Sequence, residues 1–580
     1  MSDHDLIIRN GTIYDGLGGA PFVADIGVRG ETIADIGRIT GKAPEEIDAA
    51  GRIVAPGWVD IHTHYDGQAT WDSRLQPSSN MGVTTVVMGN CGVGFAPVRA
   101  TDREALIGLM EGVEDIPGAA LHEGLQWNWE SFDEYLGALE RIPHDVDVGA
   151  QVPHGALRVY VMGERGRLRE PAAAEDRAAM RRLVEEGLRA GALGFSSSRT
   201  IHHRTVTDDY TPSFGAAAEE LIAIAEGMAA AGSGVMQYTT DNADEEEEWS
   251  LLCTLARTSG RPLSVSMTQQ PSAPDKWRRV LARIESGRAA GLKISAQVPG
   301  RSIGLLIGLQ SSSHPFIDRP SYQALAHLPL AERVERMKQP DVRAGILSEP
   351  AVGRTNFLNA MIGNYDRIFP MGDPPDYEPD PRDSVGGLAW RTGADPQDVL
   401  YDAMIAHGGR DFLYLPKSNY VSGDLEVVRK MLEHPYTLNG LSDGGAHVGL
   451  ICDASMSTYF LTHWARDRAR GDRLDLARLI RRQTHDTATA VGLRDRGLLR
   501  RGYRADLNVI DYDNLQIRPP EMRYDLPTGA RRLHQEARGY DATVLAGAVT
   551  YRNGEATGAL PGKVIRGRKP EPSAPPNTGC

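Results

Sequence analysis

The chain has 580 residues, of which 41% are hydrophobic and 24% are charged, an ordinary globular composition that excludes disorder throughout. Its net charge of −14 at pH 7 excludes the concentrated positive charge that non-specific nucleic-acid binding requires. It has no apolar run long enough for a membrane span and no secretory signal, so we expect a cytoplasmic protein that contacts neither membrane nor nucleic acid.

Both ends of the chain are rich in predicted strands. Residues 5–16 read as a strand, an Asn10-Gly11 turn and a second strand, because Asn-Gly is a strong hairpin signal. Short strands follow around residues 24–29 and 32–36, and the far end gives strands after Gly502 and across residues 542–554. Each end is too short to make a good core alone, so the pattern favours one β domain built from both.

In the middle of the chain, strand-like runs alternate with helix-like runs, which favours a parallel α/β sheet, open or closed into a barrel. The predicted strands are Thr84–Met88, Asp147–Gln151, Gly194–Ser197, Gly234–Tyr238, Leu263–Met267, Lys293–Gln297 and Tyr436–Gly440. The predicted helices are Ala174–Ala190, Ala216–Ala231, Asp275–Ala290 and Leu474–Val491. Residues 371–383 are rich in Pro and Asp and predict a long loop or insertion, and the Pro-rich tail 566–580 predicts disorder.

The first candidate site residues are His62 and His64, which follow the apolar run Trp58–Ile61. Residues two apart on a strand face the same side, so both imidazoles can bind one metal ion from one direction. Histidine is a common metal ligand because it offers a neutral nitrogen near pH 7. The alternative is a pair of half-buried histidines, but their place at the end of a strand favours a metal site.

Cys91 and Asp443 also follow strand-like runs. Cys91 lies among glycines, where it is either a small buried side chain or, as a thiolate, a soft zinc ligand. Asp443 is either an ordinary Asp-Gly turn residue or a metal-binding carboxylate. Together with the histidine pair they are the parts for activating a water on zinc, with a carboxylate to accept the proton.

Several segments along the chain resemble motifs of one known family. They are Asn10-Gly11-Thr12, 55–64, 82–92, 154–158, 191–196, Ser442-Asp443-Gly444 and 502–507. As a set they resemble the D-aminoacylase (N-acyl-D-amino-acid deacylase) branch of the amidohydrolase superfamily. The resemblance implies an α/β fold: a (β/α)8 TIM-like barrel in residues 58–497, with an insertion around 365–390, and a small β-sandwich domain from residues 1–57 and 498–565. It implies metal ligation by His62, His64, Cys91 and Asp443, with Asp443 also as the general base. It also implies a homo-oligomer.

Two histidines that this branch normally supplies are missing, since their positions fall near Thr239 and at Met267, and Met is a poor zinc ligand. We favour one metal ion per subunit, Zn²⁺ or another divalent transition metal, held by the retained residues, because three protein ligands and a water complete a catalytic zinc site. A second interpretation lets other histidines substitute: His154, His202, His203 or His447. In a third interpretation, the metal site has decayed and the protein is a non-catalytic small-molecule binding protein.

We therefore expect a metal-dependent hydrolase that cleaves an amide-type carbon–nitrogen bond, N-acyl or cyclic, of a small molecule. An ester, an activated carbon–carbon bond and a non-catalytic binding protein stay open as alternatives. The segment that normally holds a substrate-contacting lysine reads Thr268-Gln269-Gln270, which argues against a standard N-acyl-D-amino acid. Arginines, which match carboxylates bidentately, join histidines and polar side chains as candidate substrate-binding residues: His154, Arg199, His202, His203, Tyr238, Gln297, Arg301 and His447.

Overall fold

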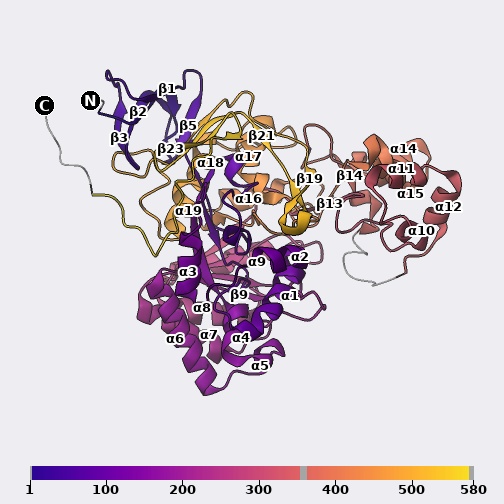
Figure 1. The fold of residues 1–580 in the computed structure, drawn as a ribbon, viewed down its shortest axis with the longest axis horizontal. Helices are drawn as coiled ribbons and strands as arrows, with labels where there is room; N and C mark the ends of the chain where they lie inside the picture. The colour runs from indigo at the N-terminus through magenta and orange to yellow at the C-terminus, as the bar shows by residue number, and fades with distance from the viewer. Residues whose placement is uncertain (1–2, 353–361, 574–580) are drawn as a thin grey trace.

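A barrel of eight parallel strands lies at the centre of the computed structural model, which describes residues 3–352 and 362–573 (Figure 1). The strands follow one another around it in chain order: β6 (Trp58–Asp60), β7 (Val83–Met88), β8 (Asp147–Pro153), β9 (Gly194–Arg199), β10 (Val235–Thr240), β11 (Leu263–Ser266), β12 (Ile294–Val298) and β16 (Thr437–Asn439). The first and last strands meet through a parallel bridge between Thr63 and Gly444, just past their ends. The predicted (β/α)8 barrel is thus confirmed.

The barrel strands are covered by helices on the outside and packed against one another's side chains on the inside. Because both faces are buried, each strand corresponds to a short, continuous apolar run in the sequence. All seven strands predicted in the middle of the chain are present to within two residues at either end. The main helices of the barrel region are α1 (Arg103–Glu114), α3 (Phe132–Glu140), α4 (His154–Met162), α6 (Ala174–Ala190), α7 (Ala218–Ala231), α8 (Glu246–Ser259), α9 (Lys276–Ala289) and α16 (Glu426–Glu433).

One helix predicted from the sequence is two helices in the structure. The run Leu474–Val491 forms α18 (Leu476–Gln483) and α19 (His485–Ala490), separated at Thr484, whose φ of −126° and ψ of −83° are not helical. Apolar spacing continues across this break, so periodicity alone does not reveal it.

The additional sheet domain contains nine strands from both ends of the chain. Its strands are β1 (Leu6–Ile13), β2 (Phe22–Arg29), β3 (Thr32–Gly37), β4 (Glu45–Asp48), β5 (Ile53–Pro56), β17 (Leu507–Ile510), β22 (Tyr540–Leu545), β23 (Ala548–Arg552) and β24 (Glu555–Ala556). Strand β17 lies between β5 and β22, so the two ends share one sheet and one buried cluster.

The expected hairpin at Asn10-Gly11 is wrong. Strand β1 continues through both residues and pairs with β2 up to Ile8 and again from Gly11, with a register shift between them. Asn10 has a φ of 59°, which Asn tolerates, and a side chain at Gly11 would approach Val54 to 2.4 Å. The pair therefore forms a bulge rather than a turn.

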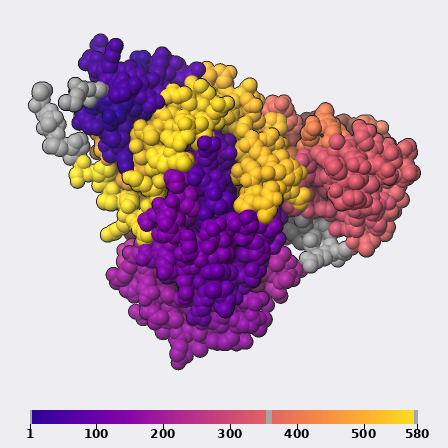
Figure 2. Space-filling model, viewed as in Figure 1, coloured from indigo at the N-terminus to yellow at the C-terminus, as the bar shows by residue number. Residues whose placement is uncertain are grey.

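A helical lobe stands beside the barrel and is larger than the insertion expected around 365–390 (Figures 1 and 2). It is built on a three-stranded sheet of β13 (Gly304–Ile307), β14 (Phe369–Pro370) and β15 (Leu413–Pro416), and it has its own buried cluster. Its helices are α10 (Pro320–Gln323), α11 (Leu330–Met337), α12 (Pro340–Ser348), α14 (Val385–Thr392) and α15 (Pro396–Ile405).

The disorder expected for residues 566–580 is wrong for the part that the structure describes. Arg566 pairs with Asp133 and Glu140, and Glu571 pairs with Arg500. Residues 574–580 lie outside the described residues. Within the described ranges, no helix combines the length and the apolar character that a membrane crossing requires.

Candidate metal centre

The closing seam of the barrel places three of the predicted ligands. His62 and His64 follow β6, and Asp443 follows β16. The backbone N–H of Asp443 donates to the oxygen of His62 at 3.1 Å, and the N–H of His64 donates to the oxygen of Gly444 at 2.8 Å. These bonds bring residues nearly 400 positions apart in the chain to the C-terminal end of the barrel, where barrel enzymes carry their active sites.

Three potential ligand atoms converge there, and a fourth, from Asp443, lies beside the two histidines. The ligand atoms of His62, His64 and Cys91 all lie within 4.8 Å of one another. His62 Nε2 is 3.4 Å from Cys91 Sγ and 3.4 Å from Asp443 Oδ1, and His64 Nε2 is 3.8 Å from the same carboxylate oxygen. The geometry thus groups His62, His64 and Cys91, and it places Asp443 next to the two histidines.

Two side chains lie against the outer nitrogens of the imidazoles. Gln297 Oε1 lies 2.6 Å from His62 Nδ1, so this nitrogen carries the proton and Nε2 keeps its lone pair toward Cys91 and Asp443. Glu114 Oε1 lies 3.3 Å from His64 Nδ1, within ion-pair distance but without a hydrogen bond between the two atoms. Burial lowers the pKa of His62 to about 4 and the pKa of His64 well below its usual range, so both rings are neutral at pH 7.

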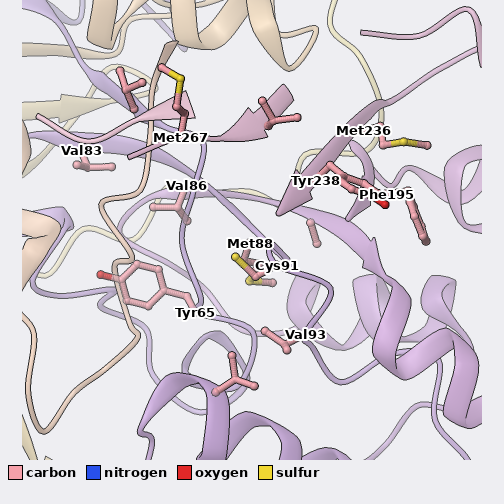
Figure 3. Packing of buried hydrophobic residues seen from close by; sticks show 14 of the residues in the cluster. Tyr65, Val83, Val86, Met88, Cys91, Val93, Phe195, Met236, Tyr238 and Met267 are labelled. Carbon is pink, nitrogen blue, oxygen red and sulfur yellow. The ribbon is translucent and has the colours of Figure 1, made fainter. Parts of the chain in front are cut away.

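Cys91 belongs to the same cluster of buried side chains as Met88 of β7 and Tyr238 of β10 (Figure 3). Burial, and then the carboxylates of Glu114 and Asp443, raise the pKa of its thiol well above its usual range. A nearby cation would reverse this effect and favour the thiolate. Burial also raises the pKa of Asp443 to about 7, which the ammonium of Lys417 opposes. The donor set therefore fits a divalent cation.

The backbone at this site is held in a conformation that side chains rarely adopt. Cys91, Asp443 and His447 have φ values of 54°, 48° and 51°, in the left-handed region. Such positions cost about 1–3 kcal/mol each and are concentrated at functional sites.

The positions of the two missing histidines hold a small polar network instead. Thr239 Oγ1 is 3.5 Å from Cys91 Sγ and 3.2 Å from Ser266 Oγ, and Gln237 Nε2 donates to both hydroxyls. Gln237 Oε1 accepts the backbone N–H of Cys91 at 2.8 Å. Met267 lies beside this network as the other expected position. None of the side chains in this network is an imidazole, so the two missing histidines have no replacement there.

A cavity of about 460 Å³ opens above the ligands. Its polar lining includes Thr200, Asp241, Lys276 and Lys417, and its apolar lining includes Trp277, Val280, Ile303, Leu305, Leu450 and Ile451. This volume and mixture are typical of small-molecule sites.

The eight predicted substrate-binding residues divide into three groups. His202, His203 and His447 line the cavity. Gln297 lies behind His62 rather than in the cavity. The other four do not line it: His154 is buried between Ser197 and Glu220, Arg199 pairs with Glu248, Tyr238 is fully buried, and Arg301 is buried against Asp453. The geometry therefore does not support substrate contact by these four residues. It also does not support His154 as a replacement metal ligand.

Two further residues were missed from the sequence. Glu114 is 1% exposed at the end of α1, on the face that buries Met110 and Val113. A charge at a core-facing helical position was the signal for it. Lys417 follows β15, whose apolar run Leu413–Pro416 marks it as a strand-end residue. Neither Glu114 nor Lys417 lies in a segment that resembles one of the family's motifs.

The family profile of the amidohydrolases matches residues 45–551. An N-acyl-D-aspartate deacylase from Alcaligenes xylosoxydans xylosoxydans is 26% identical over 97% of this chain and 95% of its own. A D-aminoacylase from the same organism is 35% identical over 45% of this chain and 49% of its own. A solved structure of D-aminoacylase, an enzyme with a binuclear metal centre, is 23% identical, covers 98% of this chain and 100% of that chain, and has a TM-score of 0.62. The chain belongs to the amidohydrolase family, in its D-aminoacylase branch.

Proposed function

We propose that the protein hydrolyses an amide-type carbon–nitrogen bond of a small N-acylated molecule, with one bound Zn²⁺. One observation carries the proposal: two neutral imidazoles, a thiol and a carboxylate converge at the floor of a cavity of about 460 Å³. Family membership supports the reaction class.

The donor set supports zinc. Sulfur, imidazole nitrogen and carboxylate oxygen are the ligands that zinc takes in proteins, and hard cations such as Mg²⁺ avoid thiolates. The Thr239–Ser266 network supports a single ion, because it replaces the nitrogen ligands that a second ion would need. In the related D-aminoacylase, one metal ion activates the enzyme and the second attenuates it.

A bound zinc ion would supply an activated water and polarise the scissile carbonyl. Asp443 Oδ1 lies 3.4 Å from His62 Nε2, so its carboxylate would stand beside a metal ion held by the histidines, where it can accept a proton and return it. Asp443 therefore takes the proton from the attacking water and delivers it to the leaving nitrogen. His62 and His64 are neutral at pH 7 because burial lowers the pKa of both rings, and Gln297 fixes the tautomer of His62.

The test combines metal replacement with an Asp443→Asn variant. Chelation should abolish hydrolysis of N-acyl amino acids of either hand, and zinc should restore it with one equivalent bound. Asp443→Asn should lower kcat roughly 10²- to 10⁴-fold, measured by amine release. Asp275→Asn, at an exposed carboxylate, is the matched control and should keep the full rate.

Two results would contradict the proposal. One is a full rate in Asp443→Asn. The other is zinc-reloaded protein that cleaves no N-acyl amino acid, cyclic imide or aryl amide in the panel.

A further inference from the structure

The side chain of Lys417 places a positive charge in the cavity, from the side of the helical lobe. It directly follows β15, whose Pro416 pairs with Gly304 of β13, and its own N–H donates to the oxygen of Ile303 at 2.8 Å. Its side chain lines the cavity together with His62, His64, Cys91 and Asp443. The lobe therefore forms one wall of the candidate active site.

The ammonium of Lys417 has no carboxylate within 4.0 Å among residues 3–352 and 362–573, although its side chain is partly buried. Lys276, which also lines the cavity, pairs with Asp244 at 3.4 Å. The other charged groups that act on Lys417, Asp443 and Asp241, do so from beyond ion-pair distance, and burial lowers its pKa. A cation withdrawn from water without a partner is costly, so this position favours an anionic ligand.

The segment that carries Lys417 is fixed against the end of β11. The N–H of Asn419 donates to the oxygen of Gln269 at 2.9 Å, and Asn419 Oδ1 accepts the N–H of Gln269 at 2.6 Å. Gln269 belongs to the segment Thr268-Gln269-Gln270, which contains no lysine. The double hydrogen bond thus anchors the chain two residues beyond Lys417 to that segment.

We propose that Lys417 binds the carboxylate of the substrate, which is an N-acyl amino acid whose apolar side chain lies against Trp277 and Leu305. This inference rests on the proposed function. It places the acyl amide at the metal ligands and the carboxylate at the lobe wall. An ammonium in this position forms a charge-assisted hydrogen bond with a carboxylate.

The experiment compares an acid with its neutral analogue in Lys417→Met. For N-acetyl-D-leucine, KM should rise roughly 10- to 100-fold, the loss expected when a hydrogen bond between charged groups is removed. For N-acetyl-D-leucinamide, KM should stay within about twofold. Lys417→Arg should restore part of the preference for the acid. An equal loss for acid and amide would mean that Lys417 acts through Asp443, and would overturn the proposal.

Two controls assign the effect to this lysine. Lys338→Met removes an exposed lysine of the same lobe and should change nothing. Lys276→Met should affect the acid less than Lys417→Met, because Asp244 already pairs with that ammonium. If Lys276→Met instead abolished the preference for the acid, the assignment to Lys417 would be wrong.

A binding measurement separates this proposal from the hydrolytic one. Zinc-loaded Asp443→Asn protein, titrated calorimetrically with N-acetyl-D-leucine and with its amide, should prefer the acid, and the added Lys417→Met change should remove that preference. If the preference is found but the wild type cleaves nothing, the anion site stands and the hydrolytic function fails. If the acid does not bind, or binds no better than the amide, the anion site fails.

Discussion

At the scale of single residues, the hydrogen bond between His62 and Gln297 decides which nitrogen of the ring faces the metal centre. Gln297 Nε2 donates to Ser264 Oγ at 3.0 Å, which fixes the amide so that Oε1 points at His62 Nδ1. Partners of this kind orient a ligand and raise its basicity. Gln297 therefore acts on the metal centre without touching it.

Replacing Gln297 with Leu should weaken zinc binding roughly 10- to 100-fold, because the ring of His62 loses the acceptor that fixes its tautomer. Competition with a chelator of known affinity measures the change. Gln535→Leu is the control, since Gln535 accepts the hydroxyl of Tyr377 and is equally buried but lies away from the ligands. Equal zinc affinity in the two variants would show that Gln297 does not tune the centre.

The sequence reveals some of these residues and hides others for a physical reason. His62, His64, Cys91 and Asp443 could be predicted because each follows a strand of the same barrel, and parallel strands end at one edge. Glu114 and Lys417 reach the cavity from a helix and from the lobe, so their proximity depends on tertiary packing. Four of the predicted substrate residues do not line the cavity, because a polar side chain beside a strand can equally belong to a buried network.

At the scale of elements, one such network joins α4 to α7. Glu220 of α7 accepts Arg158 Nη1 on both oxygens, at 2.9 and 2.8 Å, and lies 2.7 Å from His154 Nε2. All three side chains are almost completely buried. Burial alone would raise the pKa of Glu220, but His154 and Arg158 lower it below its usual 4.5. The carboxylate is thus charged wherever the protein is folded near neutral pH.

Glu220→Gln should destabilise the protein by roughly 3 kcal/mol at pH 7, because the buried charge of Arg158 loses its partner. The folded pKa is lower than the unfolded one, so this stabilisation is present above about pH 4.5 and is lost as the pH falls further. The gap in urea midpoint between wild type and variant should therefore shrink at pH 4.

Glu226→Gln on the same helix provides the comparison. Glu226 pairs with Arg181 at 3.0 Å, but both side chains are nearly half exposed, so the variant should lose no more than about 1 kcal/mol. A gap for Glu220→Gln that matched this one, or that did not change with pH, would show that the buried network contributes little.

Elements were predictable where burial alone determines them. The barrel strands are short apolar runs, and their ends lie within two residues of the expectation. Asn10-Gly11 failed because the long partner β2 keeps pairing past it, and a local turn signal contains no information about a partner strand. The lobe was underestimated because its helices pack on a separate core.

At the scale of the whole molecule, the two ends of the chain are joined by more than one contact. Strand β17 pairs with β5 and with β22, and Leu507 and Val509 lie in the buried cluster of the sheet domain. Arg496 ties the same region to the barrel through Asp147 of β8 at 2.7 Å. The sheet domain is thus complete only when synthesis has passed the last barrel strand by more than a hundred residues.

A chain that ends at residue 500 should therefore be insoluble, although it contains all eight barrel strands. It lacks β17 and β22, which leaves β5 with an unpaired edge and exposes apolar partners that each contribute roughly 1.5–3 kcal/mol when buried. A chain that ends at Ser573 keeps every described contact of the sheet and is the control. Soluble expression and zinc content measure the difference. If the chain ending at residue 500 remained soluble and bound one zinc ion, the barrel would fold without the sheet domain, and the shared sheet would not be a condition for the metal centre.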